Sequence, residues 1–358
     1  MKKSIYIFSD TIIKRKSNTL FIEKVKNKGY DDEELQLIKE EYLIGKEEII
    51  PTGDKKYIPV ESIGSIYAIG SIRFNSRFLY FLSHNNIPLH IINYKGNYSG
   101  SFLPSGKYIS GSILLKQTEI FKDYDRRLKI AKAMIDATIG NQLMNMRYHA
   151  NRGVAIEDYI EAVEEYRNEL NICSTIEEVR GIEGVAKKSY FETWKYILKY
   201  PTGFYKRLKN PPPDMINSLI SYGNAILYGL SLDSIYNTRL YPEIGFVHEP
   251  GDGKLSLSYD IADIFKPLLT DRIIFKMINK NILSEKDFFI KNGMCIIKKE
   301  GKRKFTQEFE NKIYSKLKLS GKTKRYSYKR LVLEECYKLV ALINEPDNVN
   351  YTAYISKW

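Results

Sequence analysis

The sequence lacks the features that are typical of membrane-spanning or secreted proteins. There are three cysteines, Cys173, Cys295 and Cys336, and they form no CxxC pair. An odd number of widely spaced cysteines favours neither a disulfide framework nor a cysteine-ligated zinc site. No run of about 18 apolar residues occurs, and the first apolar stretch ends at Asp10, too early for a signal peptide. We therefore expect a folded protein of the reducing cytoplasm.

Acidic residues are also fewer than basic ones. The chain has 358 residues, with 56 Lys and Arg against 43 Asp and Glu, which leaves a formal charge of +13 at pH 7. Residues 298–330 alone hold 13 basic and three acidic residues, with five aromatic residues among them. Cations interleaved with aromatics are typical of a surface that holds a nucleic-acid backbone. A solvated, lysine-rich face is the alternative. The predicted contacts in this segment are Lys302, Arg303, Lys304, Lys322, Lys324 and Arg325.

The length predicts two domains, and the pattern of apolar residues differs between them. Residues 1–103 show short stretches rich in Ile, Tyr and Val, which predict a small β domain. The expected strands are 4–8, 19–25, 57–60, 66–72 and 87–94, with a helix at 74–83. Residues 29–53 are acidic and are expected to form a polar, solvent-exposed insertion.

Residues 104–358 show helical spacing and predict a larger, mostly α-helical domain, so the expected fold class is α+β. The expected helices are 111–148, 155–170, 174–200, 212–230, 258–281, 307–318 and 327–343. A β-hairpin is expected within 287–305, turning near Glu300 and Gly301.

One acidic residue lies where a helix should be apolar. Ser174 and Glu177 predict a capping box at the start of the helix 174–200. Glu183 falls on the apolar stripe of that helix, where a carboxylate is costly unless it is paired or binds a metal ion. The alternative is a carboxylate at the edge of the stripe that pairs with Arg180 or Lys187.

A second acidic group follows a histidine near the middle of the chain. His248 precedes a Gly-rich loop that leads to a helix with Asp260 and Asp263. These two residues are three apart, so both carboxylates point to one side of the helix. Two carboxylates and an imidazole are a plausible cation site. Alternatively, Asp260 interacts with the N-terminus of its own helix and His248 is a hydrogen-bonded loop residue.

Several motifs together resemble the CRISPR-associated adaptation integrase family, the metal-dependent subunit that inserts new spacers. The similarity extends over nearly the whole chain. It is carried by RGIEG at 180–184, NPPPD at 210–214, GFVH at 245–248, DIAD at 260–263 and YTAY at 351–354.

The resemblance implies roles for individual residues. Glu183, His248 and Asp263 correspond to the three ligands of a divalent metal ion, Mg²⁺ or Mn²⁺, and Asp260 to a nearby acid that activity needs. The same motifs suggest DNA contacts by Tyr190, Lys254, Lys266 and Arg272.

The resemblance also implies an architecture and a reaction. The β domain would be a sandwich, the helical domain catalytic, and the protein a homodimer. Two dimers would hold a dimer of a small second subunit in a heterohexamer. The reaction would be endonuclease and integrase chemistry, in which prespacer 3′-hydroxyl ends join the CRISPR repeat by transesterification. The alternatives are a structure-specific nuclease for branched or single-stranded DNA, or a non-catalytic basic scaffold that binds DNA.

Overall fold

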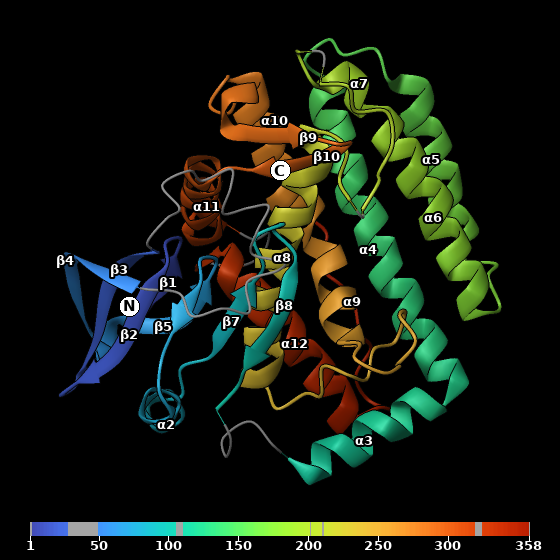
Figure 1. Cartoon of the computed structure of the whole chain (residues 1–358). Coiled ribbons are helices and arrows are strands. Elements are labelled where there is room, and N and C mark those ends of the chain that lie inside the picture. The colour runs from blue at the N-terminus through green and yellow to red at the C-terminus, as the bar shows by residue number, and fades with distance from the viewer. Residues whose placement is uncertain are drawn as a thin grey trace.

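Strands occupy the N-terminal part of the chain and helices most of the rest (Figure 1). The computed structural model describes residues 2–27, 49–104, 110–200, 202–209, 211–318 and 324–357. The predicted α+β class is confirmed. Most of the predicted polar insertion, residues 29–48, lies outside the described residues, and its last residues, 49–53, belong to a strand.

Two four-stranded sheets form the N-terminal part. In the first sheet three strands run parallel and the last is antiparallel, in the order β1 (Lys3–Ile7), β5 (Ile63–Ala68), β7 (Leu89–Ile92) and β8 (Tyr98–Phe102). The order in the second is β4 (Ile49–Pro59), β3 (Thr19–Asn27), β2 (Thr11–Lys16) and β6 (Ile72–Arg73).

The two sheets share one apolar core with the helix α2 (Ser76–Asn85). Ile13 and Leu20 come from the second sheet, Ile66 from the first and Phe78 from α2, and all four are fully buried. The five predicted strands are found, whereas β2, β6 and β8 were missed. Half of β2 is charged and β8 reads YSGSF, so neither shows the apolar pattern on which strand prediction depends.

The other face of the first sheet packs on the helices. Tyr67 and Ile92 belong to the large apolar cluster of the helical part. Gly229 makes room for this contact, because a Cβ atom there would lie 2.6 Å from the Tyr67 ring. His90 Nε2 lies 2.8 Å from Asp233 Oδ1 and ties the sheet to the helix behind it. The domain boundary at residue 103 stays a prediction.

Helices account for most of the remaining chain, and α8 runs through the middle of them (Figure 1). Their bounds are α3 (Gly111–Lys122), α4 (Tyr124–Ala150), α5 (Glu157–Glu169), α6 (Ile176–Glu192), α7 (Trp194–Ile197), α8 (Met215–Asn237), α9 (Ser256–Phe265), α10 (Arg272–Asn279), α11 (Lys299–Tyr314) and α12 (Tyr328–Asn344). None of the helices in the described ranges is long and apolar enough to span a bilayer.

The predicted hairpin turn was wrong. Strands β9 (Phe288–Lys291) and β10 (Met294–Ile297) turn at Asn292 and Gly293, which both have positive φ angles. Asn-Gly is a strong signal for a tight hairpin turn. Gly301, the predicted turn residue, lies inside α11 instead. A Cβ atom there would lie 2.8 Å from the Ile297 side chain, so this glycine lets α11 pack closely on β10.

Three predicted helices are divided, the one at 174–200 into α6 and α7 at Thr193, and a fourth is displaced. Asp123 caps α4 by accepting a hydrogen bond from Arg126 N and separates it from α3. Between α9 and α10 the chain forms a π-helical turn, Pro267–Asp271, since Pro267 has no N–H to continue the α-helical ladder. The helix predicted at 307–318 begins earlier, at Lys299, and is followed by a short hairpin of β11 (Lys316–Lys318) and β12 (Arg325–Ser327).

Candidate metal-dependent active site

A cleft of about 1130 Å³ lies among α4, α6, α8, α9 and the loops between them. It is larger than the pockets of about 300–1,000 Å³ that hold small ligands. Four carboxylates line it, together with eight cations: Arg180, Lys187, Lys188, Lys206, Arg207, Lys209, Lys254 and Lys266. The excess of positive charge suits a polyanion.

Helix α6 brings Glu183 to the edge of the cleft. Its capping box is formed by Thr175 and Glu178, so the prediction of Ser174 and Glu177 was wrong by one residue. Both neighbouring pairs have suitable side chains, which is why the sequence does not separate them. The Glu183 carboxylate is 14% exposed, and it accepts a hydrogen bond of 2.8 Å from Lys187 Nζ. The ion pair between Glu183 and Lys187, which was the predicted alternative, is therefore present.

Asp260 positions His248. Its carboxylate accepts hydrogen bonds from the backbone N–H groups of Phe246, Val247 and His248, at 2.6, 3.0 and 3.0 Å. It also lies 2.7 Å from His248 Nδ1. Gly245 permits this approach, because a Cβ atom there would lie 2.7 Å from Asp260 Oδ2. With Nδ1–H donating to Asp260, the neutral imidazole presents its lone pair on Nε2, as metal-binding histidines do.

Asp263 lies between two ammonium groups. It pairs with Lys266, and its Oδ2 atom is 3.8 Å from Lys187 Nζ. Burial alone would raise the pKa of Asp263, but Lys266, Lys187 and His248 hold it well below its usual value. Burial alone would lower the pKa of His248, yet the hydrogen bond to Asp260 and the carboxylates of Asp260, Asp263 and Glu183 raise it. The negative charges of these carboxylates therefore favour the protonated form of the His248 imidazole.

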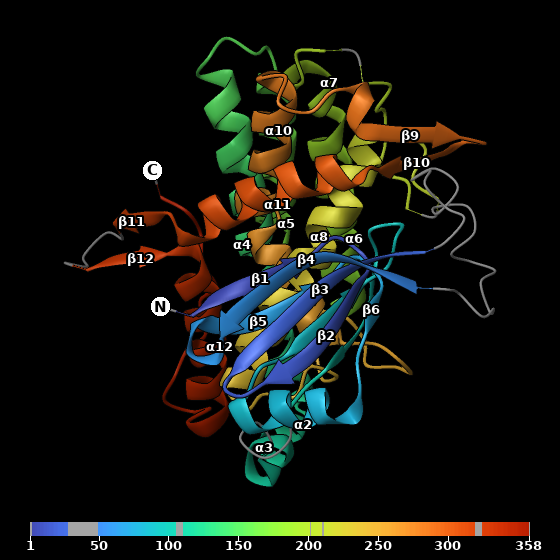
Figure 2. The same ribbon diagram turned by 60° about the vertical axis from the view of Figure 1, so that its left-hand side comes forward.

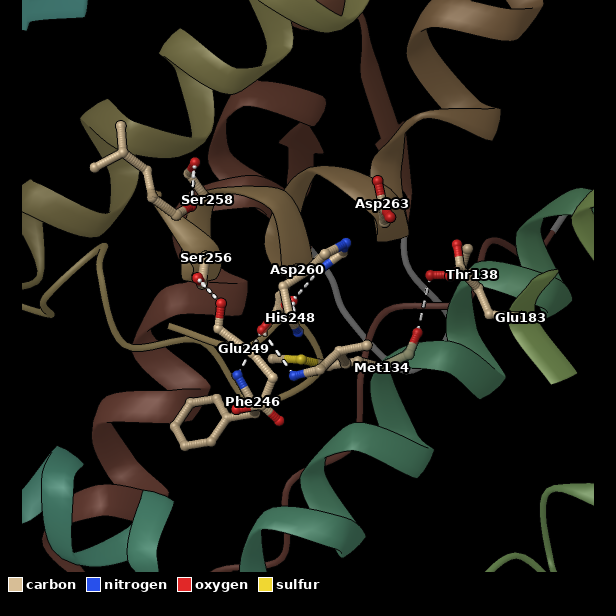
Figure 3. A network of polar contacts seen from close by, with 12 residues as sticks. Met134, Thr138, Glu183, Phe246, His248, Glu249, Ser256, Ser258, Asp260 and Asp263 are labelled. Atoms are coloured by element: carbon tan, nitrogen blue, oxygen red, sulfur yellow. Dashed lines mark hydrogen bonds and ion pairs between the residues drawn. The ribbon is translucent and has the colours of Figure 1, made fainter. Parts of the chain in front are cut away.

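The three predicted ligands reach this region from three separate segments, and the imidazole of His248 lies between Asp260 and Asp263 (Figure 3). In the described part of the chain, no three His, Cys, Asp or Glu side chains are close enough to form a complete metal site. Instead, the Lys187 ammonium lies between Glu183 and Asp263. Two carboxylates that share a cation, beside an imidazole whose Nε2 atom has no hydrogen-bond partner in the described ranges, are a donor set that fits Mg²⁺ or Mn²⁺.

The other predicted DNA contacts are dispersed. Lys254 and Lys266 line the cleft. Lys302 is 6% exposed and donates to the Tyr94 carbonyl, so it faces the interior. Arg303 pairs with Glu300 and Lys304 with Asp287, whereas Lys324 and Arg325, the first residue of β12, are exposed. Lys322 lies outside the described residues.

Most of the basic side chains of the cleft were missed. Lys206, Arg207 and Lys209 form a basic run just before the proline motif, a signal that the sequence contained. Arg180 and Lys188 lie on α6 near Glu183, and only the folded structure shows that they face the cleft.

Tyr190 and Arg272 belong to a buried network whose members Tyr190 and Asp271 also line the cleft. The Tyr190 hydroxyl donates to Asp271 Oδ2 at 3.0 Å and accepts from Asn145 Nδ2 at 3.0 Å. Arg272 Nε donates to Asn145 Oδ1 at 2.6 Å. Burial raises the pKa of the Asp271 carboxyl to about 7, although the hydrogen bond from Tyr190 and the nearby Lys266 act in the opposite direction.

Asp271→Asn is expected to change how stability depends on pH. Unfolded Asp271 ionises near pH 4, so the folded state holds an extra proton between about pH 4 and pH 7, and wild-type stability falls as the pH rises through that window. The variant has no carboxyl group to ionise at this position. Its free energy of unfolding, relative to that of wild type, should therefore rise by up to roughly 4 kcal/mol between pH 4 and pH 8. Urea unfolding at several pH values, with the exposed Asp252→Asn as control, measures this. Parallel stability curves for wild type and Asp271→Asn would contradict it.

Comparison with known proteins decides the family. A family model described as CRISPR associated protein Cas1 matches residues 5–311. The chain belongs to the Cas1 family. The CRISPR-associated endonuclease Cas1 of Clostridium perfringens (strain SM101 / Type A) is 36% identical over 346 residues, 96% of each chain. A solved CAS1 protein from Thermotoga maritima is 29% identical, with a TM-score of 0.81 over 98% of this chain and 100% of its own. The resemblance seen in the motifs is confirmed.

Two more distant solved structures share the fold. A casposase bound to integration product has a TM-score of 0.82 at 19% identity and covers 100% of this chain and 95% of its own. A chain of a Cas6-RT-Cas1–Cas2 complex has a TM-score of 0.79 at 17% identity and covers 100% of this chain and 36% of its own. At these identities the likeness concerns the arrangement of strands and helices that Cas1 proteins have.

Proposed function

We propose that the chain is a divalent-metal-dependent DNA integrase that joins prespacer 3′-hydroxyl ends to the CRISPR repeat by transesterification. It belongs to a family of CRISPR-associated endonucleases. The observation that carries the proposal is a cleft lined by eight cations, by His248 and by Asp263, in which the Lys187 ammonium lies between Asp263 and Glu183. A casposase of the same fold is bound to integration product in its solved structure, which supports the joining reaction.

Each side chain of the site has a part in this reaction. A bound divalent ion would neutralise the scissile phosphate and lower the pKa of the attacking hydroxyl. Glu183, His248 and Asp263 would hold it, and Asp260 keeps the Nε2 lone pair of His248 available. Lys266 lines the cleft, and its Nζ atom donates to the Tyr228 hydroxyl at 2.9 Å. From this position its ammonium group would contact a phosphate of the bound DNA.

The nucleophile comes from the DNA. Cys173, Cys295 and Cys336 are all buried, so none can attack a phosphate in the cleft. Gln142 Oε1 and Asn224 Oδ1 are buried atoms of cleft-lining residues that have no hydrogen-bond partner among the described residues. A water molecule held by these oxygens would satisfy them and would connect them to a substrate in the cleft.

The proposal includes the partners of the reaction. A related fold occurs in a chain that is complexed with Cas2, which supports a small Cas2-like subunit as partner. We include the homodimer, the heterohexamer of two dimers with a Cas2 dimer, and a cytoplasmic location in the same proposal. The substrates are double-stranded prespacer DNA and the CRISPR repeat.

The test is a branched duplex that mimics a half-integrated spacer. Attack by the 3′-hydroxyl of the interrupted target strand on the branch phosphate releases the flap and reseals the target strand. We expect resealing with Mn²⁺, none with EDTA, and none when the target strand ends in a 3′-deoxynucleotide. Flap cleavage without resealing would favour the structure-specific nuclease instead. Binding of DNA with no metal-dependent reaction, even after addition of the Cas2-like subunit, would favour the scaffold.

A further inference from the structure

A second cavity, of about 390 Å³, lies between the start of β1 and the β11–β12 hairpin. It shares no lining residue with the cleft. Figure 2 shows the N-terminus beside this hairpin. The cavity, which we call the hairpin pocket, has a volume within the range of small-ligand pockets, about 300–1,000 Å³. No carboxylate is among its described lining residues, which include Lys3, Tyr314, Lys316, Arg325, Tyr326 and Arg330.

The hairpin concentrates positive charge on one face. Lys316 pairs with Ser327 in the register, and Lys318 pairs with Arg325. Directly paired residues of an antiparallel ladder share a face, so Lys316, Lys318 and Arg325 lie together, and cations opposite each other are destabilising. Among the residues that the structure describes, none of these three has an ion-pair partner, whereas Arg330 pairs with Glu334. A bound anion would remove the repulsion.

An aromatic ring and a helix end complete the pocket. Tyr314 is partly exposed and lines it, whereas Tyr326 pairs with Leu317 on the other face of the hairpin and packs on the apolar core. The Tyr314 ring can stack on an unpaired base, a contact that a base already stacked within a duplex cannot make. Ser327, also in the lining, caps α12 by accepting a hydrogen bond from Arg330 N. The positive end of the α12 dipole therefore points to the same place and favours a phosphate.

We propose that the hairpin pocket binds a phosphate and an adjacent base of single-stranded DNA, such as a flap or an unpaired end. This inference rests on the proposed function, since it assumes that the chain handles DNA ends. It adds a second contact point for the same substrate. A free nucleotide would offer the same chemistry, and the experiment separates the two sources.

The test compares the double variant Lys316→Ala/Arg325→Ala with a matched control, Lys280→Ala/Lys286→Ala, which removes two exposed cations elsewhere. Fluorescence anisotropy with a labelled single-stranded oligonucleotide is measured over a salt series. The pocket variant should bind about tenfold more weakly at low salt. The slope of log affinity against log salt should become shallower by about 0.7, because the pocket is proposed to hold one phosphate. The control should stay within about twofold of wild type.

Three results would overturn the inference. The first is unchanged affinity of the pocket variant for the single strand. The second is displacement of the oligonucleotide by an equal concentration of a nucleoside monophosphate, which would assign the pocket to a free nucleotide. The third is an equal loss of binding to a polyglutamate peptide, which would assign it to an acidic protein surface. Resealing of the branched duplex by the wild type, measured in parallel, shows separately whether the proposed function holds.

Discussion

Glu183→Gln and His248→Ala are expected to abolish resealing of the branched duplex while DNA binding persists. Each change removes one of the three proposed ligands, and the cations that line the cleft remain. Loss of a residue that only orients a metal ligand typically costs about 10–100-fold. Loss of a ligand itself should therefore lower the resealing rate by more than about 100-fold.

The control for these variants is Glu192→Gln. Glu192 lies on the same helix, α6, and lines the cleft, so its replacement removes the same charge from this region as Glu183→Gln does. We expect its resealing rate to stay within a few-fold of wild type. Loss of DNA binding in Glu183→Gln or His248→Ala would show a structural role for these residues. A Glu192→Gln variant as inactive as Glu183→Gln would show that cleft charge alone matters.

Asp260→Ala is expected to impair both stability and activity. The substitution leaves three backbone N–H groups and His248 Nδ1 without their acceptor. Removing one partner of a buried, hydrogen-bonded charge typically costs about 3–5 kcal/mol. The loop that carries His248 would lose its attachment to α9, so the resealing rate should fall by about 10–100-fold, as for other residues that orient a metal ligand.

Urea unfolding and the resealing assay measure the two effects of Asp260→Ala separately. Asp252→Ala, an exposed acid in the loop after His248, is the control and should leave both unchanged. Activity is measured at a temperature where the variant is still folded, so that lost orientation is separated from lost structure. A variant with wild-type stability would contradict the proposed attachment of the loop. Full activity in a folded Asp260→Ala protein would contradict its role in positioning His248.

The sequence predicted helices and candidate site residues best where an apolar pattern extends over many residues or where several motif residues lie close together in the chain. The helices at 155–170 and 327–343 were predicted to within two residues of α5 and α12. Glu183 was found because a carboxylate on an apolar stripe needs an explanation, and the structure shows its explanation in Lys187. The metal ligands themselves were implied by the family resemblance, and they stay predictions.

Other features depend on contacts between distant residues. Asp260 was expected either to interact with its own helix or to be an acid near the metal. Its hydrogen bonds to residues 246–248 arise only because the loop folds back on α9. Lys302 was predicted to face DNA from its place in a basic segment, yet it reaches across to the Tyr94 carbonyl. Sequence spacing alone does not predict such contacts, since they are set by how helices and sheets pack.

Mn²⁺ binding to the purified chain tests the central claim most directly. Titration with Mn²⁺, in which the free ion is followed by electron paramagnetic resonance, compares wild type, Glu192→Gln and Asp263→Asn. We predict a single tightly bound ion per chain in wild type and Glu192→Gln, and at least about 100-fold weaker binding in Asp263→Asn, because a lost ligand should cost more than a lost orienting residue. Equal Mn²⁺ affinity in wild type and Asp263→Asn would contradict the assignment of Glu183, His248 and Asp263 as the metal site.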